Sequence, residues 1–149
     1  MRLDRSWIER NIPHHGRMCL LDEVVEWDAR HVRCRSGTHR LLDNPLRSQG
    51  RLGIACGIEY AAQAMAVHGA AARAAAGPRP ETGFLAGVRD VRFGVLRLDD
   101  IETDLMCDAA LVAGDQGTAL YEFALWSDAR RLLCGRATVV FDADKRVQL

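Results

Sequence analysis

The 149-residue chain is long enough to bury a hydrophobic core, and we expect one domain over residues 1–149. Lys plus Arg and Asp plus Glu both number 20, and this zero net charge argues against nucleic acid or a membrane surface as the main partner. The five cysteines are scattered and form no CxxC pair, and GxGxxG, P-loop and HExxH motifs are absent from the sequence, so we expect no metal and no cofactor.

The first quarter of the chain predicts a short helix followed by two strands. Residues 4–10 have a helical pattern with Ser6 as a candidate cap, and residues 12–16 interrupt it. Residues 18–27 read as a strand, and residues 31–36 alternate strictly between polar and apolar side chains, as a strand does. The start of the chain lacks the apolar core of a secretion signal, and no apolar run approaches ~18 residues, so we expect a cytoplasmic protein with reduced thiols.

Residues 50–77 contain the longest helical pattern in the sequence. From Ile58 onward, small apolar residues recur at steps of three and four. These positions are Ala61, Ala62, Met65, Ala66, Gly69 and Ala72. Gly77-Pro78 is a typical helix stop. Such small side chains allow a close approach by whatever packs on the helix, as a curved sheet wrapped around it requires.

Four further strands are predicted after this helix, at residues 82–93, 101–112, 118–126 and 131–141. The order of two strands, one long helix and four strands with hairpin-like links predicts an α+β protein. An antiparallel sheet wrapped around one long central helix is the hot-dog fold. One helix cannot cover both faces and all edges of such a sheet, so we expect a dimer whose sheets join edge to edge.

Glu59 is a carboxylate on the otherwise apolar start of the long helix. Free backbone N–H groups and the helix dipole favour an anion in the first turn, so one interpretation is a charge that caps the helix. The other interpretation is a general acid or base at the mouth of an apolar tunnel. Its pKa would then be raised by partial desolvation among neighbours such as Ile54 and Ile58. Gln63 lies one turn further on the same face, where it is placed to orient the carboxylate.

Three stretches resemble the 3-hydroxyacyl-[acyl-carrier-protein] dehydratases and occur in that family's order. Residues 12–24 (IPHHGRMCLLDEV) are similar to its opening motif, residues 58–64 (IEYAAQA) to the start of its central helix, and residues 83–89 (GFLAGVR) to the following strand. The combination most resembles the subfamily met in aryl-polyene pigment clusters. The resemblance implies a hot-dog hydro-lyase that acts on acyl thioesters in fatty-acid, polyketide or aryl-polyene biosynthesis.

The resemblance also implies roles for individual residues. In that family a histidine takes the C2 proton, and a helix carboxylate from the partner subunit protonates the departing hydroxyl. A backbone N–H at the helix start polarises the thioester carbonyl. Glu59 matches the carboxylate position, and the amides of Cys56 and Gly57 match the position that binds the carbonyl.

The sequence departs from the family at the catalytic histidine. Residues 42–46 stand where the family has His-Phe-Pro-Gly, and they contain no histidine. The candidate replacements are His14, His15 and His39. His14 matches the family's opening histidine. The alternative to catalysis is a structural role, in which the His14 ring holds its loop in place by hydrogen bonds. His39 is expected to be a solvated side chain in its loop. Asn44 is placed either to orient a substrate carbonyl or water, or to form a turn with Pro45.

The acyl chain is expected in a tunnel along the helix, with Met65, Phe84 and Leu85 as wall residues. The expected partners are an acyl group carried by acyl-carrier protein or coenzyme A and a second hot-dog subunit, identical or paralogous. Two alternatives to the dehydratase stay open. One is a hot-dog thioesterase, which uses the helix carboxylate without an upstream histidine. The other is a non-catalytic subunit that completes a heterodimeric dehydratase. His31 and His68 are expected to face away from Glu59.

Overall fold

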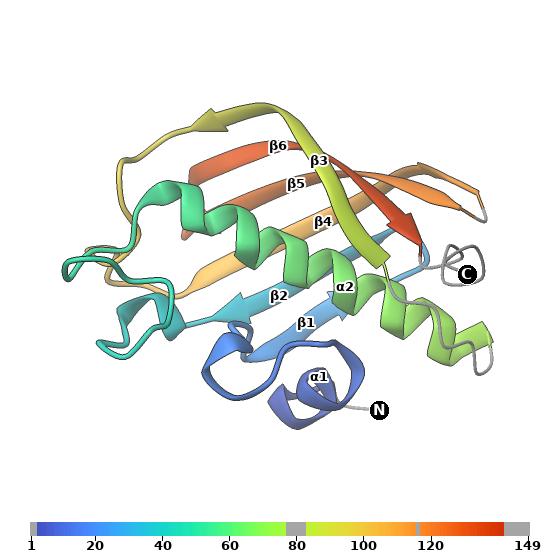
Figure 1. The fold of residues 1–149 in the computed structure, drawn as a ribbon, viewed down its shortest axis with the longest axis horizontal. Helices are drawn as coiled ribbons and strands as arrows, with labels where there is room; N and C mark the ends of the chain where they lie inside the picture. Colours follow the sequence, from blue (N-terminus) through green and yellow to red (C-terminus); the bar gives the residue numbers. More distant parts are fainter. Residues whose placement is uncertain (1–2, 77–82, 116, 142–149) are drawn as a thin grey trace, which may run out of the picture.

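The computed structural model describes residues 3–76, 83–115 and 117–141. An antiparallel six-stranded sheet curls around a long helix, α2 (Gly57–Ala76), and this arrangement confirms the predicted hot-dog fold (Figure 1). The strands are β1 (Glu23–Trp27), β2 (His31–Ser36), β3 (Gly83–Phe93), β4 (Leu105–Gly114), β5 (Thr118–Ser127) and β6 (Arg130–Phe141).

The strand order across the sheet is β1-β2-β4-β5-β6-β3. The predicted pairing of neighbours in the chain holds for β1 with β2, β4 with β5, and β5 with β6. The expected hairpin of β3 with β4 is wrong. β3 pairs with β6, and β4 pairs with β2. Residues 94–104 therefore connect one edge of the sheet to its middle rather than forming a hairpin. This connection leaves β3 as an edge strand.

The hydrophobic core lies between α2 and the inner face of the sheet. Along β5, inward side chains such as Phe123 and Leu125 are buried and alternate with more exposed ones. The helix contributes small buried residues, among them Ala64. At Gly57 the helix lies close to the sheet, because a Cβ there would lie 2.4 Å from a methyl carbon of Leu133. The small residues of the helix thus permit the tight wrapping expected from the sequence.

Several predicted boundaries shift in the structure. The first helix, α1 (Arg5–Asn11), is capped by Asp4 rather than Ser6, since the Asp4 carboxylate accepts the Trp7 N–H at 3.0 Å. β1 begins five residues later than expected, because a 3-10 turn (Gly16–Met18) and an extended stretch precede it. Another 3-10 turn (Ile54–Cys56) leads into α2. The predicted helix stop at 77–78 lies outside the described residues.

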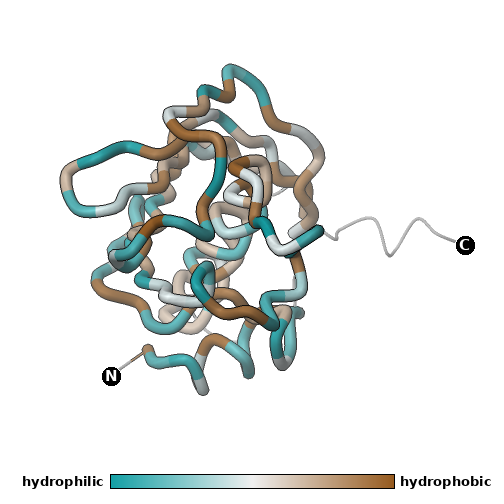
Figure 2. The backbone as a smooth tube through the Cα atoms, turned by 90° about the vertical axis from the view of Figure 1, so that its left-hand side faces the viewer, coloured by the Kyte–Doolittle hydropathy of each residue, from teal (hydrophilic) through white to brown (hydrophobic). Residues whose placement is uncertain are grey.

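β3 is exposed along nearly its whole length in the single chain. Seen from the end at which α2 begins, strands and loops lie around the helix, and hydrophilic residues recur in the outer loops (Figure 2). On β3, Leu85, Val88 and Phe93 pair with inward-facing residues of β6, yet all three are exposed in the single chain. The outer edge of β3 pairs with no strand of the described chain. Within that same part of the chain, no helix is both long and apolar enough to cross a membrane.

Candidate active site

A cavity of about 170 Å³ runs along one side of α2. The helix lines it with Glu59, Ala62, Ala66, Gly69 and Arg73, which follow one another at steps of three and four and so form one stripe. The opposite wall includes Leu85, Tyr121, Val139 and Phe141. Every residue of the helical stripe is half-buried, whereas most of the remaining helix surface is buried. The cavity is therefore an apolar groove with polar groups at its two ends.

His14 and Glu59 lie in direct contact at one end of this cavity. The distance from His14 Nε2 to Glu59 Oε1 is 3.1 Å, and both side chains line the cavity wall. Nδ1 of His14 is buried and has no hydrogen-bond partner among the described residues. Nε2 is thus the nitrogen that donates to the carboxylate. The side chains are 27% and 34% exposed, so a ligand can approach the pair from solvent.

The electrostatics of Glu59 differ from the sequence-based expectation. The hydrogen bond from His14 lowers the pKa of Glu59, and this effect outweighs desolvation, which acts to raise it. A second hydrogen bond, from Gln63, lowers the pKa of Glu59 further. The predicted rise in pKa is therefore wrong, because the carboxylate has two donors beside it. Glu59 is ionised at neutral pH.

Gln63 joins α2 to the segment that carries His14. Its amide nitrogen donates to Glu59 Oε1 at 3.3 Å and to the Met18 carbonyl at 2.8 Å. Its amide oxygen accepts the Leu20 N–H at 2.9 Å. Gln63 is fully buried, so it holds both partners without competition from water. The structure thus brings Gln63 to Glu59, as its position one turn along the helix predicted.

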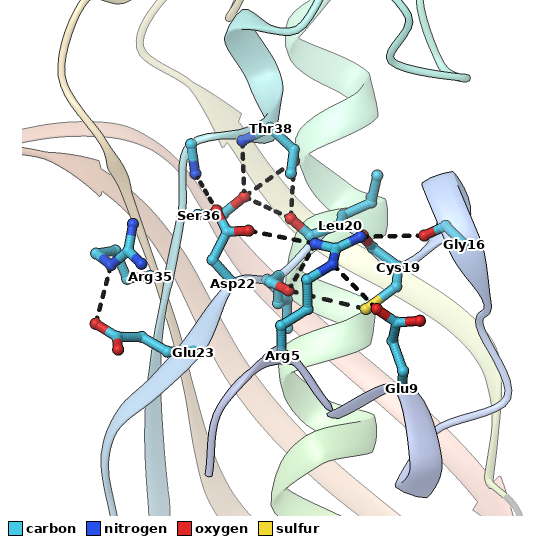
Figure 3. A network of polar contacts seen from close by, with 12 residues as sticks. Arg5, Glu9, Gly16, Cys19, Leu20, Asp22, Glu23, Arg35, Ser36 and Thr38 are labelled. Atoms are coloured by element: carbon cyan, nitrogen blue, oxygen red, sulfur yellow. Dashed lines mark hydrogen bonds and ion pairs between the residues drawn. The ribbon is translucent and has the colours of Figure 1, made fainter. Parts of the chain in front are cut away.

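The loop that carries His14 is fixed from its other side by Arg5 of α1. The Arg5 guanidinium donates to the carbonyls of Gly16 at 3.1 Å and Cys19 at 2.7 Å, and it forms an ion pair with Asp22 at 3.2 Å (Figure 3). The Leu20 carbonyl accepts hydrogen bonds from the hydroxyl groups of Ser36, the last residue of β2, and Thr38, as the same view shows. These bonds fix the chain that follows His14, from the 3-10 turn at Gly16–Met18 to Asp22.

Three other predicted substrate-binding residues lie away from the cavity wall, and their polar groups are engaged within the chain. The Cys56 N–H donates to the Gly53 carbonyl at 3.0 Å, and the Gly57 N–H donates to the Ile54 carbonyl. The Asn44 side chain donates to the Thr38 carbonyl at 2.9 Å and to the Tyr60 hydroxyl at 3.0 Å, and it accepts the Leu46 N–H. These contacts are those of a turn and a helix start.

The wall residues expected from the sequence separate into two groups. Met65 and Leu85 line the cavity. Phe84 is 55% exposed and lies on the opposite face of β3 from Leu85. Tyr121 and Arg73 also line the cavity and escaped the sequence analysis. The alternation of large apolar residues along β5 could have indicated Tyr121 as an inward residue, whereas nothing in the helical pattern marked Arg73.

The remaining histidines lie apart from Glu59. His39 is fully buried, and its Nε2 bonds to the Ile101 carbonyl at 2.9 Å, so the prediction of a solvated side chain is wrong. His15 is exposed. His68 is buried on another face of α2, where its ring contacts Tyr121 and the Asp28 carbonyl. His31 lies on the outer face of the sheet, 3.9 Å from Asp108. His14 is therefore the histidine that the fold brings to the carboxylate.

Similar proteins include both dehydratases and thioesterases. A chain of the dehydratase heterocomplex ApeI:P from Xenorhabdus doucetiae superposes with a TM-score of 0.82 at 24% identity, over 94% of this chain and 93% of that one. Thioesterases from Pseudomonas aeruginosa and Haemophilus influenzae have a TM-score of 0.59 at 11% and 8% identity, over 80% of this chain and 79% and 76% of theirs. A sequence search of curated proteins found no match.

The family comparison is more specific than the shared fold. The ApeP-like family, described as ApeP dehydratase, matches residues 6–148. The matched region includes the His14 loop, α2 and every strand of the sheet. The chain belongs to the ApeP-like dehydratase family.

Proposed function

We propose that this dehydratase removes water from a 3-hydroxyacyl group carried as a thioester on acyl-carrier protein, with His14 and Glu59 as its proton-transferring pair. The observation that carries the proposal is the 3.1 Å contact between these two side chains at one end of an apolar cavity. Such a cavity suits an acyl chain, and elimination of water needs one group that takes a proton and one that gives a proton.

The charge state of Glu59 assigns the two roles. An ionised carboxylate is a poor proton donor, so Glu59 takes the C2 proton of the substrate, and the Nε2–H of His14 supplies the proton to the hydroxyl on C3. The electrons of the C2–H bond form the C2–C3 double bond as the C3–O bond breaks and water leaves. A proton then passes from Glu59 to His14 across their contact and restores the starting state. These roles are the reverse of those that the family resemblance implies.

The contact also sets the direction from which the substrate approaches. Because the two groups touch each other within one chain, the substrate does not lie between them but faces both from the cavity side. The acyl chain extends from the pair along the groove, past Ala62 and Ala66. The resemblance to the aryl-polyene subfamily supports an extended, unsaturated acyl chain as the natural substrate.

The assembly we propose is a heterodimer with a paralogous hot-dog subunit. The solved relative from Xenorhabdus doucetiae is a heterocomplex. In this chain the uncovered apolar face of β3 includes Leu85, Val88 and Phe93, which lie on the side of the sheet that carries the cavity. A partner strand at this edge would complete the sheet and cover the open side of the groove.

The test is turnover of a 3-hydroxyacyl-carrier-protein by the purified chain, alone and together with its hot-dog partner. Formation of the conjugated enoyl thioester is followed by its absorbance and by mass spectrometry. We expect turnover that requires Glu59. Absence of product from both preparations would contradict the proposal, and so would equal turnover by Glu59→Gln.

A thioesterase reaction is the second candidate, and the ionised state of Glu59 favours it. An ionised carboxylate can act as base or nucleophile toward a thioester carbonyl. Release of free thiol from acyl-coenzyme A, measured with a thiol reagent, separates the two reactions. Thiol release that depends on Glu59, without enoyl formation, would replace the dehydratase proposal by this one.

A further inference from the structure

Arg89 and Arg92 lie on the outer face of β3, the strand at the edge of the sheet. Their partners across the ladder, Arg136 and Cys134, occupy the outward positions of β6, between residues that are buried. Strict alternation would place two residues three positions apart on opposite faces of a strand. Here a β-bulge inserts one extra residue, because three steps along β3 match two along β6. The bulge therefore brings both arginines to the same face.

The extra residue of the bulge is Asp90. Its φ angle of 55° is in the left-handed region, which Asp tolerates better than most residues other than glycine. Bulges at sheet edges commonly redirect side chains in this way. Asp90 is the one carboxylate of β3. It lines a depression on the outer face of the sheet, whereas neither Arg89 nor Arg92 lines that depression.

The positive charge of Arg89 and Arg92 is not balanced from the side of β6. Both residues are exposed, and neither forms an ion pair with another residue that the structure describes. Arg136 stands directly opposite Arg89, and like charges opposite each other in a ladder are destabilising. The Glu122 carboxylate already pairs with Arg136 at 3.5 Å. A counter-charge for these arginines must therefore come from beyond the open edge of β3.

The other features of the β3 edge do not discriminate between partners. The inner face offers Leu85, Val88 and Phe93, and the backbone offers free N–H and C=O groups, which suit a strand of any hot-dog subunit. A second copy of this chain, related by a two-fold axis, would place its own two arginines on the same outer face of a strand about 5 Å away. The outer face of β3 therefore acts against pairing of the chain with itself.

We propose that Arg89 and Arg92 select the partner subunit. They disfavour a second copy of this chain and favour a paralogous hot-dog subunit whose edge strand carries carboxylates on its outer face. Specificity of this kind combines a repulsive contact against the wrong partner with an attractive contact to the right one. Arg–carboxylate pairs supply the attractive contact. This inference rests on the proposed assembly through β3 and adds the residues that decide which subunits pair.

Mixing two forms of this chain tests the inference without the partner subunit. Isotopically labelled Arg89→Glu/Arg92→Glu is mixed with the unlabelled wild-type chain, and the pairs are resolved by native mass spectrometry. We expect the mixed pair to be at least about 10-fold more stable than either homotypic pair, because it sets glutamates against arginines. The difference should shrink at about 1 M salt, where the Debye length is about 3 Å. Equal stability of mixed and homotypic pairs, or no pairing in the mixture, would overturn the inference.

The matched control for this mixture is Arg10→Glu/Arg30→Glu. It changes the net charge by the same amount at two exposed arginines, one on α1 and one in the turn between β1 and β2. Because both positions lie away from β3, this variant should give no excess of mixed pairs with the wild-type chain. An excess equal to that of the β3 variant would show that net charge, rather than the β3 edge, controls pairing.

Titration with the paralogous hot-dog subunit gives a second measurement. We expect Arg89→Glu/Arg92→Glu to bind that subunit about 10- to 100-fold more weakly than the wild-type chain, and the control variant to bind it as the wild type does. Thermal melts establish that both variants fold. Unchanged affinity of the β3 variant would overturn the inference and leave the proposed assembly in place, because Val88→Asp on the inner face tests that assembly separately. Absence of turnover bears on the proposed function alone, since the readout here is pairing.

Discussion

His14 Nε2 and Glu59 Oε1 lie 3.1 Å apart within one chain. The family resemblance implies a histidine and a carboxylate from different subunits, with the histidine just before the central helix. Here the segment before β1 supplies the histidine, and the loop at residues 42–46, which lacks one, turns back on itself through Asn44. The two side chains of the proposed acid–base pair therefore touch within a single subunit. In the proposed assembly the partner subunit covers the groove.

Replacement of Glu59 by glutamine should abolish the proposed proton abstraction. Gln keeps the size of the side chain but cannot take a proton, so we expect a loss of about 10²- to 10⁴-fold in the rate of enoyl formation. Glu122→Gln is a suitable control, because Glu122 pairs with Arg136 at 3.5 Å on the outer face of the sheet. Activity of the Glu59 variant within a few-fold of wild type, with the control unaffected, would remove Glu59 from the mechanism.

The titration of Glu59 should depend on His14. Because the bond from His14 is the largest cause that lowers the pKa of Glu59, His14→Asn should raise that pKa, with desolvation then acting against a weaker set of donors. Carboxyl carbon shifts in a pH series of NMR spectra measure this directly. An unchanged Glu59 titration in folded His14→Asn would show that the contact does not form in solution.

The same shift has a consequence for stability. A carboxyl whose pKa is lower in the folded state stabilises the fold above its unfolded-state pKa, and this contribution is lost as the pH falls through the folded-state value. The difference in stability between wild type and His14→Asn should therefore shrink as the pH falls below the usual range of glutamate. Urea titrations at several acid pH values follow this trend.

The fold was predictable because its patterns are local. The small-residue period of α2 and the strict alternation of β2 each identify one element, and their order in the chain allows few topologies. The position of β3 was not predictable in this way. Its pairing with β6 joins segments that are far apart in the sequence, and no local pattern encodes which strand lies at the edge.

The site was predictable only in part for a similar reason. Glu59 is conspicuous as a charge on an apolar helix, and Gln63 follows from helical spacing. The direction of the Glu59 pKa shift was not predictable, because it depends on a histidine 45 positions away, whose segment is held beside the helix by contacts that include those of Arg5 and Gln63. Arg73 likewise acquires its place in the cavity from the way the sheet closes over the end of the helix.

Loss of the Gln63 amide should destabilise the fold as well as the site. Gln63→Leu leaves the Leu20 N–H and the Met18 carbonyl without their partner, and we expect a loss of about 2–4 kcal/mol in the free energy of unfolding. Asn11→Leu removes an amide that donates to a carbonyl near the surface of α1, and its cost should stay within about 0.5 kcal/mol. Equal urea midpoints for the two variants would contradict the bridging role of Gln63.

A charge on the inner face of β3 should prevent assembly. Val88 is exposed in the single chain and would be buried by a partner strand, so Val88→Asp would place an unpaired carboxylate in the interface. We expect loss of the complex in size-exclusion chromatography with light scattering. Val112→Asp, at an exposed valine of β4 inside the sheet order, should assemble normally. Assembly of Val88→Asp at wild-type affinity would place the interface elsewhere.

Two glycines at the start of α2 offer a matched test of how tightly the sheet wraps the helix. A Cβ on Gly57 would lie 2.4 Å from Leu133 Cδ2 and 3.1 Å from Leu125 Cδ2, whereas a Cβ on Gly53 would meet no atom within 4 Å. Both glycines have negative φ angles, −61° and −64°, so backbone strain does not distinguish them. We expect Gly57→Ala to lose about 1–3 kcal/mol from overpacking. Gly53→Ala should be neutral or slightly stabilising, because alanine restricts the unfolded chain. Equal stability of the two variants in urea would mean that the core beside Gly57 can accommodate a methyl group without cost, which would contradict the tight packing of the helix against the sheet.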